Sequence, residues 1–165
     1  TDRSRGLGDV YKRQVIYLNF AEAKAEMGSL TQDDLNNSIN KLQARAGLPA
    51  MTTTPDADPA NNMGVSNLIW EIRRCRRCEL IMDNWYRYWD LIRWHQLDKL
   101  DSTKYPNTML GANVSNVPDC EEATKNGYID ASDAQIRTYE AKHYFYPIPT
   151  TQLTLNKNMK QNPGW

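Results

Sequence analysis

Asp119, Glu121 and Glu122 are the acidic residues whose spacing comes closest to a glycosidase carboxylate pair. They lie in a polar stretch, without the apolar neighbours that raise the pKa of a catalytic acid. The chain also has no nucleophile elbow, phosphate-binding loop or zinc-protease motif. The sequence therefore predicts that the protein is not an enzyme.

Cysteines and histidines are the residues that could bind a metal. Cys75 and Cys78 form a single C-x-x-C inside a helical pattern, and Cys120 makes the cysteine count odd. No second C-x-x-C or paired histidine follows, and His95 and His143 stand far apart. We expect structural or free thiols, no metal site and no cofactor.

Charges balance along the chain, with 20 basic and 20 acidic residues. This balance gives no global attraction to nucleic acid or to an anionic membrane, and no apolar run is long enough to span a bilayer. Glu71, Glu79 and Asp83 lie at helical spacings from the main arginine cluster, so we expect an ion-paired helix face and no nucleic-acid partner. That cluster is Arg73, Arg74, Arg76 and Arg77.

Aromatic residues concentrate between Trp85 and Leu97, a segment that holds three of the five tryptophans. An aromatic stripe at helical spacing most often belongs to a core. We therefore expect Trp85, Trp89 and Trp94 to form a structural aromatic core. The alternative is a platform on which sugar rings stack.

The elements that must position these residues are mainly helices. Gly28 and Gly47 are expected stops, Thr31 with Asp34 resembles a capping box, and Ser66 can cap a helix. The first two helices should form an antiparallel hairpin like a tetratricopeptide repeat. The hydrophobic period places the helices at about 15–27, 31–46, 66–82 and 85–100.

The remaining segments are expected to be irregular. We expect a surface loop at 50–65 and a long excursion at 101–140 with at most short strands or turns. Beyond it, 139–149 should be extended because of Pro147 and Pro149, and the turn-rich tail should dock Trp165 on the body. Residues 1–14 are polar and aperiodic, and we expect them to be a non-native leader.

Two separated motifs stand in the second half of the chain. The first is RRCEL at 76–80, followed by RYWDLIRW at 87–94. The second is the closing run, YFYPIP at 144–149 through KQNPGW at 160–165. Together they resemble the C-terminal signature of the SusD/RagB family of nutrient-binding outer-membrane lipoproteins. The chain departs from the family pattern at Asp83-Asn84, where an acidic residue and a glycine are usual.

This resemblance covers residues 15–165 and implies the C-terminal part of a longer, SusD-like protein. The implied fold is mainly α, with a tetratricopeptide-like helix hairpin, a long irregular loop and an extended C-terminal tail. The implied function is non-catalytic binding of oligosaccharides at the cell surface, with delivery to a SusC-like TonB-dependent transporter. The parent protein would be an outer-membrane lipoprotein, whose N-terminal lipid anchor lies outside this segment.

Sugar sites combine aromatic faces with hydrogen-bonding groups at the rim. Within the implied fold, the 101–140 excursion offers Tyr105, Asn107 and Tyr128 as candidate ligand-binding residues. The competing hypothesis is a helical-repeat adapter that binds a protein partner and no sugar. The hairpin fits an adapter, but the unrepeated aromatic helix and the long loop fit a repeat array poorly. Exposed aromatic rings that cluster on a loop surface would favour the sugar hypothesis.

Overall fold

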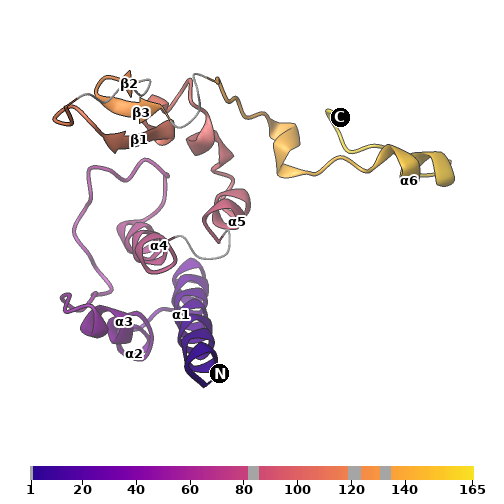
Figure 1. Ribbon diagram of the computed structural model, residues 1–165. Coiled ribbons are helices and arrows are strands. Elements are labelled where there is room, and N and C mark those ends of the chain that lie inside the picture. Colours follow the sequence, from indigo (N-terminus) through magenta and orange to yellow (C-terminus); the bar gives the residue numbers. More distant parts are fainter. Residues whose placement is uncertain (1, 82–85, 119–123, 131–134) are drawn as a thin grey trace. The chain divides into compact units, whose positions relative to one another are not determined.

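The computed structural model describes residues 2–81, 86–118, 124–130 and 135–165 (Figure 1). It divides into two compact units, the first reaching Arg87 and the second running from Tyr88 to Trp165. Helices dominate the described residues, which confirms the prediction of a mainly α fold. No helix in the described part of the chain is both long and apolar enough to cross a bilayer.

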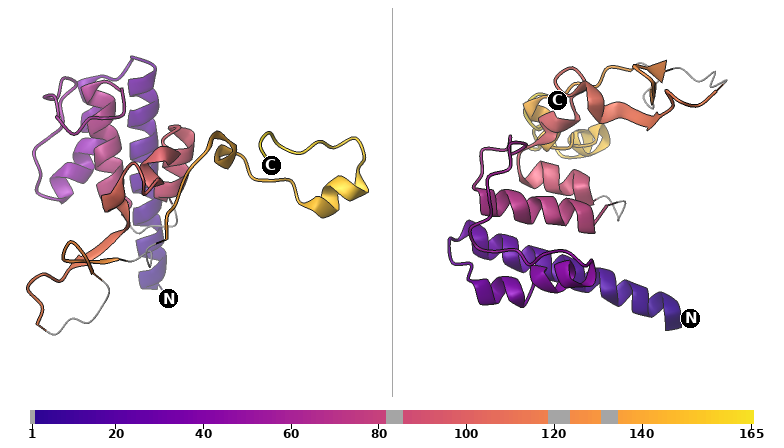
Figure 2. Two further views of the ribbon diagram at one scale, coloured as in Figure 1. Left: turned by 90° about the horizontal axis from the view of Figure 1, so that it is seen from above. Right: turned by 90° about the vertical axis from the view of Figure 1, so that its left-hand side faces the viewer.

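The first unit is built on the long helix α1, which packs against α3 and α4 (Figure 2). Both predicted helix starts are confirmed: Thr31 forms a capping box with Asp34, and the Ser66 hydroxyl accepts from the Ile69 amide at 3.3 Å. These caps satisfy backbone amides that have no partner inside the helix. The helices of this unit are α1 (Asp2–Glu26), α2 (Gln32–Asn36), α3 (Ile39–Arg45) and α4 (Asn67–Glu79).

Gly28 ends α1 and Gly47 follows α3, as the sequence predicted. Both have a left-handed backbone, with φ of 67° and 69°. After α1 the Ser29 amide donates to the Lys24 carbonyl at 3.0 Å, and after α3 the Leu48 amide donates to the Gln43 carbonyl at 2.9 Å. In each case the amide bonds to the carbonyl five residues earlier, which is the hydrogen bond of a Schellman cap. Glycine adopts the left-handed backbone of this cap at little cost, because it has no Cβ.

In the first unit, two helices differ from the prediction. The helix expected at 31–46 is broken between α2 and α3, where Ser38 has φ −130° and ψ −96°. Its hydroxyl donates to the Asp34 carbonyl at 2.6 Å and so offers the backbone an alternative to the helical pattern. The helix expected to start at 15 instead begins at Asp2, since adding residues to an existing helix costs little.

The core of the first unit joins all four helices with Met51, in the loop, and Leu80, which follows α4. The Asn40 side chain holds this loop from both sides, accepting from the Met51 amide at 2.7 Å and donating to its carbonyl at 3.1 Å. Burial of these apolar side chains is the main stabilising contribution to the unit. The core residues are Leu18, Ala21, Leu35, Ile39, Leu42, Met51, Ile72, Cys75 and Leu80.

The aromatic helix, predicted at 85–100, is shorter than expected. It is α5 (Tyr86–Arg93), and a 3-10 helix, η1 (Leu97–Leu100), follows it. His95 has a left-handed backbone with φ 53°, and the Gln96 amide donates to the Leu91 carbonyl at 2.8 Å. This is a third Schellman cap, here with histidine in place of glycine.

The 101–140 excursion contains a small antiparallel sheet of order β1–β3–β2. Its strands are β1 (Leu110–Asn113), β2 (Thr124–Lys125) and β3 (Tyr128–Asp130), and the 3-10 helix η2 (Pro106–Met109) precedes them. Asn126 and Gly127, with φ of 55° and 80°, connect β2 and β3. Two such residues form the turn that suits a tight hairpin.

The tail contains helical turns that the sequence did not predict. The 3-10 helix η3 (Ala141–Tyr144) lies where an extended segment was expected, and α6 (Thr150–Leu155) lies in the tail. At the start of η3, the Glu140 amide donates to Nδ1 of His143 at 2.8 Å. This local bond favours the turn over the extended form.

Candidate functional site

The predicted ligand-binding residues lie on different parts of the excursion: Tyr105 precedes η2, Asn107 is in η2, and Tyr128 is in β3. Tyr105 is half-buried, and Nζ of Lys99 donates to its hydroxyl at 2.9 Å while lying 4.6 Å from its ring centroid. Asn107 is exposed in η2, and Tyr128 is half-buried in β3. Among the described residues, the two tyrosines form neither a ring contact nor a hydrogen bond with each other. Their role in binding stays a prediction.

Asp101 links the two ends of the 101–140 excursion, which carries these residues. Its buried carboxylate accepts from the Thr103 hydroxyl at 2.6 Å and from the Tyr139 amide at 3.3 Å. Ser102 and Arg137 add a second link, because the Ser102 amide donates to the Arg137 carbonyl at 2.9 Å. The hydrogen bond from Thr103 lowers the pKa of Asp101, so the carboxylate stays charged.

Trp89, on α5, corrects the prediction that Trp85, Trp89 and Trp94 form an aromatic core. Trp94 is buried at 8% exposure, but Trp89 is 52% exposed, and Trp85 lies outside the described residues. Asp90 and Leu91 are buried beside Trp94, so the helix turns this face inward and carries Trp89 outward. The period of the aromatic residues showed that a face exists, but not which face would be buried.

Tyr88 and Tyr146 connect α5 to the C-terminal tail. The hydroxyls of Tyr88 and Tyr146 form a hydrogen bond at 3.4 Å, and the Tyr88 ring meets Trp89 edge-on with centroids 5.6 Å apart. The hydrogen bond to Tyr146, together with desolvation, raises the pKa of Tyr88 to about 12. The Tyr88 hydroxyl therefore remains protonated at neutral pH and can donate or accept hydrogen bonds.

Trp165 was predicted to dock on the body of the protein, and the structure shows it docked on the η3 turn of the same C-terminal segment. Its Nε1 donates to the carbonyls of Lys142 and Phe145 at 3.1 and 3.0 Å, and its ring contacts His143 with centroids 5.8 Å apart. Nζ of Lys142 lies 5.5 Å from the ring centroid. The ring is still 48% exposed, so part of it remains accessible.

Aromatic rings of the second unit are the best candidate for a ligand surface. Trp89, Tyr146 and Trp165 are exposed, and Tyr88, Tyr139 and His143 are half-buried. Tyr139 belongs to this set because its ring contacts His143, with centroids 5.6 Å apart. We call this set the aromatic surface. It comprises Tyr88, Trp89, Tyr139, His143, Tyr146 and Trp165.

A separate hollow of about 590 Å³ lies in the first unit, between α4 and the loop at 48–56. Glu71 and Arg74 form part of its wall and are joined by two hydrogen bonds of 2.8 and 2.5 Å. These bonds raise the pKa of Arg74. The hollow has the size of a small-molecule site, but its lining contains no aromatic ring on which a sugar could stack.

Cys75 lies next to this hollow, because Nε2 of Gln43, one of the lining residues, donates to Sγ of Cys75 at 3.9 Å. Cys75 is buried in the first core, and this burial raises its pKa to about 12, whereas Cys78 is exposed. Within the described ranges, no three His, Cys, Asp or Glu side chains are grouped so that they could hold a metal ion. Cys120 and the acidic residues Asp119, Glu121 and Glu122 lie outside those ranges.

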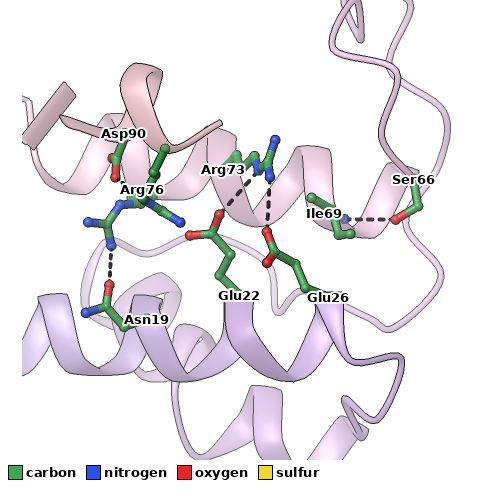
Figure 3. Close-up of polar contacts among 9 residues, drawn as sticks. Asn19, Glu22, Glu26, Ser66, Ile69, Arg73, Arg76 and Asp90 are labelled. Carbon is green, nitrogen blue, oxygen red and sulfur yellow. Dashed lines mark hydrogen bonds and ion pairs between the residues drawn. The ribbon is translucent and has the colours of Figure 1, made fainter. Parts of the chain in front are cut away.

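Two arginines of the cluster on α4 form polar contacts with residues of α1 (Figure 3). Arg73 lies 3.3 Å from Glu22 and 3.1 Å from Glu26, and Arg76 donates to the Asn19 amide oxygen at 2.8 Å. The expected pair between Arg74 and Glu71 is present on α4. The first signature motif is thus bound to the helix that precedes it, which gives these polar residues a structural role.

Comparison with known families gives one result that covers nearly the whole chain. The model of the SusD family matches residues 16–165, which include both aromatic and arginine-rich motifs. No curated protein and no solved structure matches the chain. Members of the SusD family are outer-membrane-associated lipoproteins that take part in nutrient uptake, generally bind glycans without cleaving them, and typically work with SusC-like transporters. Because the match extends over far more than half of the residues, the chain belongs to the SusD family.

Proposed function

We propose that this protein binds oligosaccharides at the outer surface of the cell and delivers them to a SusC-like, TonB-dependent transporter. The observation that carries this proposal is the family match over residues 16–165. The parent protein would be attached to the outer membrane through a lipid. It would bind its ligand without breaking a glycosidic bond.

The aromatic surface supports sugar binding at this chain. Trp89, Tyr146 and Trp165 are 52%, 64% and 48% exposed, and a pyranose ring presents C–H groups that stack on such faces. The hydroxyls of Tyr88 and Tyr146 can exchange hydrogen bonds with sugar hydroxyls. Exposed aromatic rings on one surface are the feature that separates a sugar-binding protein from a plain helical adapter.

One observation favours the adapter hypothesis. Ile16 and Phe20 lie on α1 and are 63% and 42% exposed, and Met27, which follows the helix, is 77% exposed. Ile16 and Phe20 are four residues apart and so share a face that could contact another helix. An adapter would use this face and would not need the aromatic surface.

The proposal is tested by calorimetry with a panel of plant and host oligosaccharides, with analysis of the products. Both the 165-residue chain and the full open reading frame that contains it should be titrated. A shallow site that competes with water should bind in the micromolar to millimolar range, roughly −4 to −8 kcal/mol. Release of shorter sugars would contradict the non-catalytic proposal.

A matched pair of variants locates the site. Trp89→Ala should weaken binding because it removes a half-exposed ring of the aromatic surface. Phe20→Ala removes a comparably exposed ring from α1 and should leave sugar binding unchanged. The reverse result, or an effect of Phe20→Ala on capture of a protein partner without any sugar binding, would favour the adapter.

A further inference from the structure

The C-terminal segment has a charge distribution unlike the rest of the chain. Residues 141–165 contain Lys142, Lys157 and Lys160 and no aspartate or glutamate. The preceding residues contain 17 of the 20 basic residues and all 20 acidic ones, so their formal charge is negative. The neutral total therefore conceals a positive C-terminal segment, which we call the basic tail.

Side-chain bonds fold the basic tail back on itself. Gln161 donates to the Ile148 carbonyl at 2.9 Å and accepts from the Ile148 amide at 2.8 Å. Asn162 donates to the Tyr146 carbonyl at 2.6 Å. The residues between these two points, including α6, Lys157 and Lys160, thus form a loop whose ends are held together. Holding a segment in one shape lowers the entropy cost of binding.

The lysines of the basic tail are available for an anion. Lys157 and Lys160 are exposed, and neither forms an ion pair with any residue the structure describes. Lys142 pairs with Glu140 at 3.4 Å, but that glutamate side chain is 63% exposed, so water and salt weaken the pair. Lys142 also lies over the Trp165 ring, which places a cation directly beside a stacking face.

Exposed rings accompany these charges. Phe145 and Tyr146 are 57% and 64% exposed at the start of the tail, and Trp165 closes it. In the sequence between these rings, several residues have neutral side chains that can form hydrogen bonds. They are Thr150, Thr151, Gln152, Thr154, Asn156 and Asn158. Flat rings, amides and hydroxyls match a sugar chain, and lysines without acidic neighbours match a negative charge on it.

We propose that the basic tail selects acidic oligosaccharides, meaning sugar chains that carry uronate or sulfate groups. The rings of Tyr146 and Trp165 stack on pyranose faces, while Lys157 and Lys160 pair with the anionic groups. This inference rests on the proposed sugar-binding function and adds the chemical class of the ligand. Two exposed ion pairs, one at each lysine, predict a preference of roughly five- to thirtyfold over a neutral chain.

An anionic membrane surface fits these observations less well. An interfacial helix needs a long apolar face, but α6 has only six residues, and its apolar side chains are Leu153 and Leu155. The threonines and amides of the tail would gain little from the apolar side of a bilayer. Binding to lipid vesicles is therefore an outcome that the experiment must separate from sugar binding.

The experiment compares oligogalacturonate with a neutral xylo-oligosaccharide of equal length by calorimetry at low and high salt. The acidic chain should bind roughly five- to thirtyfold more tightly at low salt, and this preference should shrink at high salt because exposed charges are screened. Lys157→Gln with Lys160→Gln should remove the preference and leave neutral-sugar binding unchanged. Lys41→Gln, an exposed lysine of the first unit, is the control and should have no effect.

The possible failures have different meanings. Equal affinity for both sugars, or a preference that survives the double substitution, would overturn the inference but leave the proposed function standing. Absence of binding to any sugar would overturn both. Binding to vesicles of anionic phospholipid without binding to oligogalacturonate would overturn the inference and identify the basic tail as a membrane contact. A sulfated oligosaccharide in a third titration separates a need for sulfate from a need for uronate.

Discussion

Glu22 on α1 and Arg73 on α4 form a buried ion pair, with 3.3 Å between Oε1 and Nε and side-chain exposures of 3% and 10%. The pair joins the helix before the signature to the signature helix itself. Removing one partner of a buried pair leaves a charge without compensation, which costs far more than loss of an exposed pair. Glu22 and Arg73 are thus expected to matter for stability and not for ligand contact.

Arg73→Gln should lower the free energy of unfolding by about 3–5 kcal/mol, the cost of breaking a buried ion pair. Arg74→Gln is the matched control, because it breaks the pair with Glu71 in which Arg74 is 50% exposed. The control should cost less than about 1 kcal/mol. Urea unfolding of both variants measures the difference, and equal losses would contradict a buried structural role for Arg73.

Trp94→Ala should cost about 3–5 kcal/mol of stability, as expected for a large aromatic ring removed from a core. Trp89→Ala should cost clearly less, since its ring is 52% exposed. Thermal unfolding of the two variants tests this contrast. A larger loss for Trp89 than for Trp94 would show that the outward face of α5 has been assigned to the wrong residue.

Cys75 should resist alkylation at pH 8, because burial raises the pKa of its thiol to about 12 and the reactive thiolate is almost absent. Cys78 is exposed and should react while the protein is folded. Mass spectrometry after iodoacetamide treatment, with and without urea, distinguishes the two. Rapid labelling of Cys75 in the folded protein would mean that the core around it opens.

The same thiol also predicts a pH dependence of stability. In the unfolded chain Cys75 has a pKa near 9.0, and in the folded protein near 12. The Cys75 thiol therefore keeps its proton to higher pH in the folded protein than in the unfolded chain. Its contribution to the free energy of unfolding is complete below pH 9 and is lost as the pH rises toward 12. In Cys75→Ala, the decrease in the free energy of unfolding that this thiol causes at alkaline pH should be absent. Unfolding measured from pH 8 to 11 tests this.

Gly127→Ala should disrupt the small sheet. An added Cβ would lie 2.1 Å from the Ser115 hydroxyl oxygen, and φ of 80° is unfavourable for alanine. Gly64→Ala is the control, because Gly64 has φ 67° but no atom within 4 Å of the added carbon. The control should show only the backbone cost, about 1–2 kcal/mol. Hydrogen exchange of the Val114 amide, which donates to the Gly127 carbonyl, reports the local damage; equal protection in both variants would contradict it.

Tyr146→Phe should lower the pKa of Tyr88 from about 12 toward its usual value near 10.0, because the hydrogen bond between the Tyr88 and Tyr146 hydroxyls is the main cause of the shift. Carbon NMR of labelled tyrosine follows the titration residue by residue. Tyr105→Phe provides a control, since Tyr105 bonds to Lys99 and not to Tyr88. An unchanged Tyr88 titration in the Tyr146 variant would mean that the two hydroxyls do not meet in solution.

Local chemistry explains which elements could be predicted from sequence. The Thr31 capping box, the Ser66 cap and the glycine stops at Gly28 and Gly47 each involve residues no more than five positions apart. Their geometry follows from neighbouring residues alone. The Asn126-Gly127 hairpin has the same character, and its dipeptide is the signal that could have located β2 and β3 in advance.

Other features of the candidate site depend on contacts between residues that are far apart in the sequence. The aromatic period of α5 predicts an apolar stripe, but Asp90, Leu91 and Trp94 are buried while Trp89 is exposed. Trp165 was expected to dock, but its partners, the carbonyls of Lys142 and Phe145, could not be named from the sequence. Likewise, Tyr105 and Tyr128 have suitable side chains, yet the folded excursion does not bring their rings into contact.

The sequence by itself determined the family, the mainly helical fold and the charge asymmetry of the tail, since these depend on motifs, periodicity and composition. The tertiary structure decided which face of α5 is buried, that Arg73 pairs with Glu22, and that Tyr146 meets Tyr88. Such pairings join residues about fifty or more positions apart. Their energy depends on how packing excludes water around both partners, and no local pattern of residues specifies that.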